Sequence, residues 1–277
     1  LKWGKIKKRR QYDIGAYSQG GKSAMCYLGK SMLIISSSPG EKLQHRLEDD
    51  NLHDYKLKKY KVTELPSETK EGFVRIEVGS LKRRIKDNEL KDVLVNTYRP
   101  LIQNGEVIIN YNGERLEVKP FPIETEVSNF NFSVKNTSNE FNTVKGWIGN
   151  LTPRSGFRGG IRCYKLGRLI CDKEFFGHPD ASYKQTLNFL FGEVYLNHIP
   201  VTTNKTDFDR DSEEWFEAET KINEILKPFV DELLGREILE PTDEEKERVR
   251  QAKDIVAELM KMRKKELRGT AGVDGTS

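Results

Sequence analysis

The chain has 277 residues, of which 47 are basic and 43 acidic, so its formal net charge is only +4. Apolar residues make up 36% and charged residues 32%, a more polar mixture than that of an average globular domain. The 13 Phe, 10 Tyr and 3 Trp residues can still build a core, which excludes a disordered chain. No apolar run approaches the roughly 18 residues of a membrane span, and the near balance of charge does not itself predict nucleic-acid binding.

Three cysteines, Cys26, Cys163 and Cys171, are an odd number at spacings that fit neither a disulfide framework nor a zinc site. Reduced, packed thiols and a cytoplasmic location are therefore expected. The first residues are basic and no apolar stretch follows, so no signal peptide is predicted. Because the chain begins at Leu1 and ends in a run of small residues, we expect a piece of a longer protein.

In the first half of the chain, apolar periodicity and turn residues predict a mixture of short elements. A helix is predicted from Gly21 to about Leu28, with Gly29 as its C-cap, and the apolar run 31–37 predicts a buried strand. The polar residues 38–54 give no assignment. Further predictions are strands at 55–63 and 72–79 joined by a turn at 66–70, a helix at 87–103, and a hairpin at Asn112-Gly113 between 107–109 and 116–118.

Prolines at 120 and 122 break regular structure, so a domain boundary is predicted somewhere in 120–135, and a second unit near Asn142. Asp211 with Glu214 predicts the capped start of an amphipathic helix that Pro228 kinks. A long charged helix is predicted from Thr242 to about Leu267. The strands predicted for this unit are 144–151, 160–164, 169–171 and 190–196.

One glycine-rich segment, Gly15-x-x-x-x-Gly20-Gly21-Lys22-Ser23, has a composition suited to phosphate. Glycines let backbone N–H groups approach an anion closely, and the positive end of the following helix would face it. The extra glycine and the lack of a preceding apolar strand argue against a P-loop. A tight turn that caps a helix is the alternative interpretation.

An ordered series of motifs resembles one segment of the GHKL ATPases, the superfamily of gyrase B, heat-shock chaperones, histidine kinases and MutL proteins, and most of all its MORC-like branch. The series is Trp3 to Lys7, then Ile14 to Ala24, then Leu28-Gly29-Lys30. In that family the matching segment is the ATP lid with its second glycine box. The resemblance therefore implies that Gly15, Gly20, Gly21, Lys22 and Ser23 bind the triphosphate of ATP. Ser18 departs from the pattern, because the family usually has a closely spaced glycine there.

The second half adds to this resemblance. The segment from Gly160 to Ile170 looks like the central hairpin of the transducer domain that follows the family's ATPase domain, and 201–208 resembles the loop whose lysine reaches the γ-phosphate. By this resemblance Lys205 is the catalytic lysine, which would stabilise charge on the transferring phosphoryl group. A solvated surface lysine is the alternative.

The family's Asn-rich helix, with its catalytic Glu and magnesium-binding Asn, and its Asp-x-Gly-x-Gly adenine box are not found in the 277 residues. Gly72-Phe73 stands where a Gly-Thr pair is expected. The resemblance thus implies that Mg²⁺ ligands and the general base lie upstream, and that this chain alone lacks ATPase activity.

Other patterns are weaker. The run Lys5 to Arg10 fits DNA phosphate or nucleotide, although a solvated lid segment is the simpler interpretation. The four histidines have no metal-ligand spacing. Asp207, Asp209 and Asp211 alternate as in a calcium loop but lack its glycine and glutamate, so helix capping explains them better.

Together these patterns predict an α+β fold: 1–125 as the C-terminal part of a GHKL two-layer sandwich, 126–235 as a transducer domain and 236–277 as an exiting charged helix. The implied function is an ATP-operated conformational clamp that uses ATP and Mg²⁺, acts as a homodimer, and has DNA or a protein as a further partner. The alternative is a non-catalytic assembly module that binds protein or DNA through the same fold.

Overall fold

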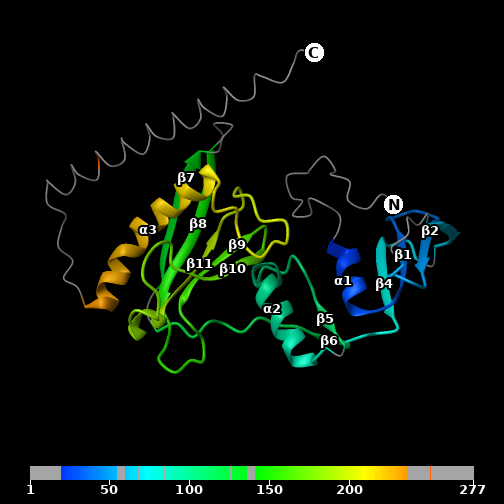
Figure 1. The fold of residues 1–277 in the computed structure, drawn as a ribbon, viewed down its shortest axis with the longest axis horizontal. Coiled ribbons are helices and arrows are strands. Elements are labelled where there is room, and N and C mark those ends of the chain that lie inside the picture. The colour runs from blue at the N-terminus through cyan, green and yellow to red at the C-terminus, as the bar shows by residue number, and fades with distance from the viewer. Residues whose placement is uncertain are drawn as a thin grey trace, which may run out of the picture. The chain divides into compact units, whose positions relative to one another are not determined.

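A computed structural model describes residues 20–54, 60–67, 69–83, 85–124, 127–135, 141–235 and 250. It divides the chain into two compact units, 1–226 and 227–277, and most described residues belong to the first. Within them the fold is α+β, as the sequence predicts (Figure 1). The basic segment 1–12, Gly15 and almost all of the predicted helix 242–267 lie outside the described residues.

The first part is a four-stranded antiparallel sheet with one helix. Its elements are α1 (Gly20–Leu28), β1 (Ser31–Ser37), β2 (Leu43–Asp49), β3 (Thr63–Pro66) and β4 (Phe73–Gly79), in the sheet order β3-β2-β1-β4. A small core of Met25, Met32, Leu47 and Leu52 joins α1 to the sheet, with Ile34 and Val78 packed against it. The helix near 21–28 and the strands 31–37 and 72–79 are thereby confirmed.

The strands between β1 and β4 differ from the prediction. The strand β2 lies in the segment 38–54, for which the sequence predicts no element. Of the strand predicted at 55–63, residues 55–59 lie outside the described residues and 60–62 are not in a strand, whereas β3 occupies Thr63–Pro66. Residues 66–70 do not close a hairpin, because β3 pairs with β2 whereas β4 pairs with β1. Pro66 lacks a backbone N–H and is tolerated because β3 is an edge strand.

Gly29 ends α1 by close approach rather than by a left-handed turn. Its N–H donates to the Met25 carbonyl at 2.9 Å, and a Cβ on it would lie 2.4 Å from the carbonyl oxygen of Gly79. Lys30 N–H in turn donates to that same oxygen at 3.0 Å. The C-terminal end of α1 is therefore fixed directly to the end of β4.

Helix α2 (Asp87–Gln103) matches the predicted helix at 87–103. Pro100 lies inside it, and Tyr98, two residues earlier, departs from helical geometry with φ −113°. The hairpin turn lies where it is predicted, but its strands are β5 (Asn110–Tyr111) and β6 (Glu114–Arg115) rather than 107–109 and 116–118. Asn112 and Gly113 both have positive φ, 52° and 83°, which is the backbone that a two-residue hairpin turn requires.

The second part is a five-stranded mixed sheet in the order β10-β9-β11-β8-β7. Only β9 and β11 pair in parallel among its strands. A 3₁₀ helix, η1 (Gln185–Phe189), precedes β11. The strands are β7 (Ser128–Lys135), β8 (Phe141–Asn150), β9 (Gly160–Lys165), β10 (Arg168–Glu174) and β11 (Leu190–Tyr195).

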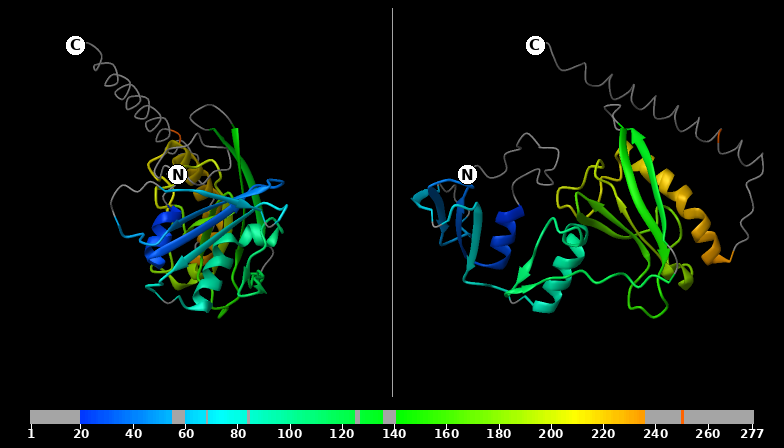
Figure 2. Two further views of the ribbon diagram at one scale, coloured as in Figure 1. Left: turned by 90° about the vertical axis from the view of Figure 1, so that its right-hand side faces the viewer. Right: turned by 180° about the vertical axis from the view of Figure 1, so that it is seen from behind.

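The part of helix α3 (Glu213–Leu234) that belongs to the first unit lies beside this sheet (Figures 1 and 2). Its buried residues within the first unit are Trp215, Ala218, Ile222 and Leu226. Two contacts fix it: Lys221 Nζ donates to the Ser133 carbonyl at 2.7 Å, and Asn223 Nδ2 donates to the Phe176 carbonyl at 2.6 Å. The helix begins at a different cap from the one predicted: Ser212 Oγ, not Asp211, accepts the N–H of Trp215 at 3.2 Å.

Helix α2 is joined to the same sheet by buried polar groups. The Arg99 guanidinium is 5% exposed, stacks on the Phe121 ring at 3.5 Å and donates to the Lys119 carbonyl at 2.5 Å. Arg99 Nε lies 3.9 Å from Glu193 on β11, whose carboxylate also accepts from Tyr164 at 3.0 Å. Five consecutive residues of β9 and of β11 are buried, so both faces of the sheet centre are covered.

Candidate functional site

The first turn of α1 holds four of the five residues expected at the lid. Gly20, Gly21, Lys22 and Ser23 follow one another there, and both glycines are exposed. A Cβ added at Gly20 or Gly21 would meet nothing within 4 Å, so packing of the described residues does not require glycine at either position. The first N–H groups of a helix have no acceptor within the helix and carry partial positive charge. This turn is therefore suited to an anion.

The loop that carries Lys205 follows β11 and is closed at its ends by a bridge between Val201 and Phe208. Inside it, the Thr202 hydroxyl donates to Asn204 Oδ1 at 2.8 Å and accepts the N–H of Asp207 at 3.3 Å. The N–H of Lys205 donates to the Thr202 carbonyl at 2.9 Å. These bonds hold the loop in one conformation.

Lys205 occupies the left-handed region of the backbone map, with φ 58°. Residues other than glycine seldom adopt this conformation, and they keep it only where the surrounding structure enforces it. Such residues are found more often at functional sites than elsewhere. The side chain is partly buried, and burial lowers the pKa of its ammonium group, with a further contribution from the positive charge of Arg168. Among the described residues no carboxylate forms an ion pair with Lys205.

The acidic groups beside the loop are engaged by Arg210. Arg210 Nε donates to Asp207 at 2.9 Å, and its Nη2 donates to Glu174 on β10 at 2.6 Å. The guanidinium also lies 4.7 Å over the Trp215 ring, which stacks between Phe176 and Phe208. The loop is thus packed on β10 at one side and on the first turn of α3 at the other.

The structure places the glycine turn and the lysine on separate elements. Gly20 to Ser23 share one turn of α1, whereas the described contacts of the Lys205 loop are with β9, β10 and α3. Gly15 lies outside the described residues.

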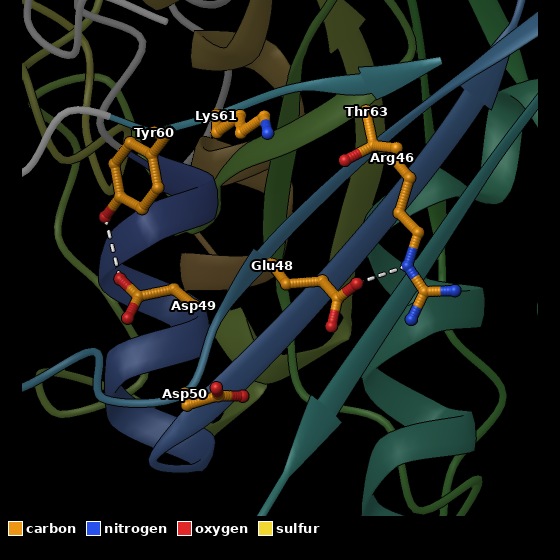
Figure 3. A pocket seen from close by; sticks show the side chains of 7 residues that line it. All are labelled: Arg46, Glu48, Asp49, Asp50, Tyr60, Lys61 and Thr63. Carbon is orange, nitrogen blue, oxygen red and sulfur yellow. Dashed lines mark hydrogen bonds and ion pairs between the residues drawn. The ribbon is translucent and has the colours of Figure 1, made fainter. Parts of the chain in front are cut away.

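Sequence reasoning missed a hollow of about 400 Å³ at β2 and β3 (Figure 3). Two of its acidic groups have partners: Arg46 pairs with Glu48, and the Tyr60 hydroxyl donates to Asp49 at 2.8 Å. Burial and this hydrogen bond raise the pKa of Tyr60 to about 12. The remaining lining residues are Asp50, Lys61 and Thr63. We assign no ligand to the hollow, because Glu48 and Asp49 already have partners within it.

The other reactive side chains do not form a second site. The three cysteines are free thiols. Burial raises the pKa of Cys163, and burial followed by the charge of Glu174 raises that of Cys171 to about 12, so neither is an activated nucleophile. The described residues contain no group of three or more His, Cys, Asp or Glu side chains that could hold a metal ion. No helix in the described part of the chain has the length and apolar character needed to cross a bilayer.

Comparison with known proteins gives a similarity of fold at low sequence identity. No protein-family model and no curated protein matches the chain. Among solved structures it is similar to the ATPase region of Saccharomyces cerevisiae topoisomerase II bound to ICRF-187 (dexrazoxane), with a TM-score of 0.44 and 10% identity over 84% of this chain and 69% of that chain. Another structure of the ATPase region of the same enzyme gives 0.42 and 10% over 84% and 68%.

Proposed function

We propose that the chain is part of an ATP-binding conformational clamp of the GHKL type, close to the MORC-like branch. In this proposal the lid residues enclose the triphosphate, and Lys205 on the transducer loop contacts the γ-phosphate. ATP occupancy would then favour dimerisation. The domain arrangement is that of an ATPase domain ending near 125, a transducer domain to 235 and an exiting helix.

The observation that carries the proposal is the state of Lys205. A surface lysine normally extends into water with an ordinary backbone, whereas this one is partly buried at φ 58° on a hydrogen-bonded loop. Burying an ammonium group without a counter-charge is unfavourable. A bound phosphate would supply that counter-charge, and this is the role that the sequence resemblance gives to Lys205.

The first turn of α1 supports the same interpretation. Gly20 and Gly21 have open space where a side chain would begin, so the fold of the described residues leaves both glycines unexplained. Close approach of a phosphate to the backbone would explain them. Lys22 and Ser23 follow in the same turn and would add a cation and a hydroxyl.

The described residues fit the phosphates of ATP but not its metal ion. Magnesium, when bound, neutralises charge on the β- and γ-phosphates. The family motifs that supply the metal ligands, the general base and the adenine contacts are not found in this sequence. We propose that a segment upstream of this chain supplies them. Residues of this chain would bind and orient the phosphates and exclude water from them.

The test is Lys205→Ala in the protein that carries this chain together with that upstream segment. Loss of a positioned group that stabilises the transition state lowers turnover by roughly 10²–10³-fold, so we expect ATP turnover to fall by this factor. ADP has no γ-phosphate, so its affinity should not change. Steady-state kinetics with a parallel ADP titration measures both.

Lys173→Ala is the matched control. Lys173 also has a left-handed backbone, with φ 63°, but it is exposed on β10. Both variants therefore place alanine at a positive φ, and only the Lys205 variant should lose turnover. Unchanged turnover in Lys205→Ala, or no ATP turnover in the unmodified protein, would contradict the proposal, and the second result would favour a non-catalytic assembly module.

A further inference from the structure

The hairpin of β9 and β10 lies against the segment that carries Lys205, and two contacts fix them together. Near the start of that segment, Lys165 Nζ on β9 donates to the Ile199 carbonyl at 2.6 Å. After its end, Arg210 Nη2 donates to Glu174 on β10 at 2.6 Å. In the sequence of the hairpin, Arg168 lies between the two contact residues Lys165 and Glu174, at the first position of β10. In the sequence of the loop segment, Lys205 likewise lies between Ile199 and Arg210.

Arg168 has an unmet hydrogen-bonding requirement. Its Nε atom is buried and has no hydrogen-bond partner among the described residues. Buried N–H groups are almost always paired in folded proteins, so an unpaired one requires an explanation. The turn before it is fixed by Leu166 at φ 49° and Gly167 at φ 75°, and the Leu101 side chain packs against that glycine. The backbone position from which the Arg168 side chain starts is therefore fixed by this turn.

Arg168 and Lys205 are close enough for their charges to interact, and among the described residues neither forms an ion pair with a carboxylate. The charge of Arg168 contributes to the lowered pKa of Lys205, after the contribution of burial. Two acids of these segments are already engaged: Asp207 accepts from Arg210 and from the N–H of Phe208, and Glu174 accepts from Arg210 and from the N–H of Phe176. Arg168 and Lys205 therefore have no negatively charged ion-pair partner among the described residues.

We propose that Arg168 and Lys205 together form a binding site for a terminal phosphate group, with the Arg168 guanidinium as a second ligand of the phosphate oxygens. This second phosphate ligand rests on the proposed function, because Arg168 would add to the phosphate contact that the proposed function assigns to Lys205. A planar guanidinium offers directed N–H donors to phosphate oxygens, whereas an ammonium group acts as a point charge. The pair is suited to a doubly charged terminal phosphate rather than to a singly charged phosphodiester.

The test uses the 277-residue chain and inorganic phosphate as the probe. Arginine labelled with ¹⁵N at Nε gives an NMR signal for the Arg168 Nε–H group, which should move saturably when phosphate replaces chloride at constant ionic strength. The backbone amides of 202–207 should move with the same affinity. Arg115, an exposed arginine on the other hairpin, is the internal control and should show only a small, unsaturated change.

Variants assign the binding. Arg168→Gln and Lys205→Ala should each weaken phosphate binding about tenfold or more, the effect expected when a charged hydrogen bond is lost. Arg168→Lys should recover part of the affinity, and Arg115→Gln should change nothing. Melting temperatures close to that of the unmodified chain would show that the variants are folded.

Three results would overturn the proposal. One is an Arg168 signal that moves no more than that of Arg115. Another is phosphate affinity that survives Arg168→Gln but not Lys205→Ala, which would leave the proposed function of Lys205 intact. The third is a shift produced by a DNA duplex but not by inorganic phosphate. Conversely, phosphate binding that needs both side chains in a protein without ATP turnover would support this site while rejecting the proposed function.

Discussion

Lys205 shows how much a single residue can reveal when its backbone and its surroundings are considered together. A lysine in the left-handed region costs on the order of 1 kcal/mol or more, and the same residue also gives up part of its hydration. Neither cost is offset by an ion pair within the described residues. Such a residue is expected where an external ligand completes the interaction, which is why its neighbour Arg168 has the same interpretation.

His198 is a second residue whose surroundings lead to a prediction. Burial, followed by the charge of Lys165, lowers its pKa from 6.5 to about 4, and its buried Nε2 atom has no hydrogen-bond partner among the described residues. Glu214 and Glu217 act in the opposite direction without reversing the shift. The folded protein therefore keeps this ring neutral at a pH where the unfolded chain would protonate it.

Linkage gives the sign of the effect. Between pH 6.5 and 4 the unfolded state binds more protons at this histidine, so its contribution to the free energy of unfolding is present above pH 6.5 and is lost as the pH falls. For a partly exposed group the loss should be on the order of 2 kcal/mol. Urea unfolding at pH 7 and pH 4.5 should show a smaller decrease for His198→Gln than for the unmodified chain. Equal decreases would show that the ring is not held neutral.

Among the elements, α1 has a glycine at its first position, Gly20, and another directly after its last position, Gly29. A side chain would have open space at Gly20 but would clash at Gly29. Gly29→Ala would bring a Cβ to 2.4 Å from the Gly79 carbonyl oxygen and 2.6 Å from Val78 Cγ1. Because the first of these atoms is backbone, we expect a loss of about 1–3 kcal/mol in the free energy of unfolding. Gly20→Ala meets no atom within 4 Å and removes a glycine from a helix, so stability should be unchanged or slightly higher.

The same pair of variants separates packing from ligand binding. If Gly20 approaches phosphate, Gly20→Ala in the protein with the upstream segment should lower the affinity for a non-hydrolysable ATP analogue while the protein stays folded. Denaturant unfolding and a melting curve with and without the analogue measure the two effects. Similar losses of stability in Gly20→Ala and Gly29→Ala would contradict this division of roles.

The sequence predicts those elements whose burial follows a simple period. The apolar run Ser31–Ser37 and the periodic segment Asp87–Gln103 have the predicted bounds, and the turn Asn112-Gly113 has the predicted positive φ angles. The strand Leu43–Asp49 escapes prediction because two of its buried side chains, Gln44 and Asp49, are polar. Its hydrophobic pattern therefore does not show which face is inside.

Pairing and capping are decided by contacts that a local pattern does not contain. The strand Thr63–Pro66 is short and ends in a proline, and it pairs with Leu43–Asp49 rather than with the next strand along the chain. Ser212 caps α3 although Asp211 has the more familiar spacing. For the site, the motif order singles out Lys205, but the importance of Arg168 depends on an unpaired buried atom that only the structure shows.

For the whole molecule, the proposal predicts that nucleotide affinity is divided between this chain and the segment upstream. By that proposal the chain would contribute phosphate contacts, whereas the adenine and metal contacts would be missing. Isothermal titration calorimetry on the 277-residue chain should therefore show no micromolar binding of magnesium-ATP, and the same chain joined to the upstream segment should bind it. Micromolar, magnesium-dependent binding by the chain alone would show that it needs no such segment.

Phe208 connects the Lys205 loop to helix α3. Its backbone closes the loop by pairing with Val201, and its ring stacks on Trp215 with ring centroids 5.6 Å apart. Trp215 is only 1% exposed, and the Arg210 guanidinium lies over its ring. Indole fluorescence is sensitive to nearby charge and to water. In a variant in which Trp3 and Trp147 are replaced by Phe, the emission of Trp215 would therefore follow the position of the loop without any added dye.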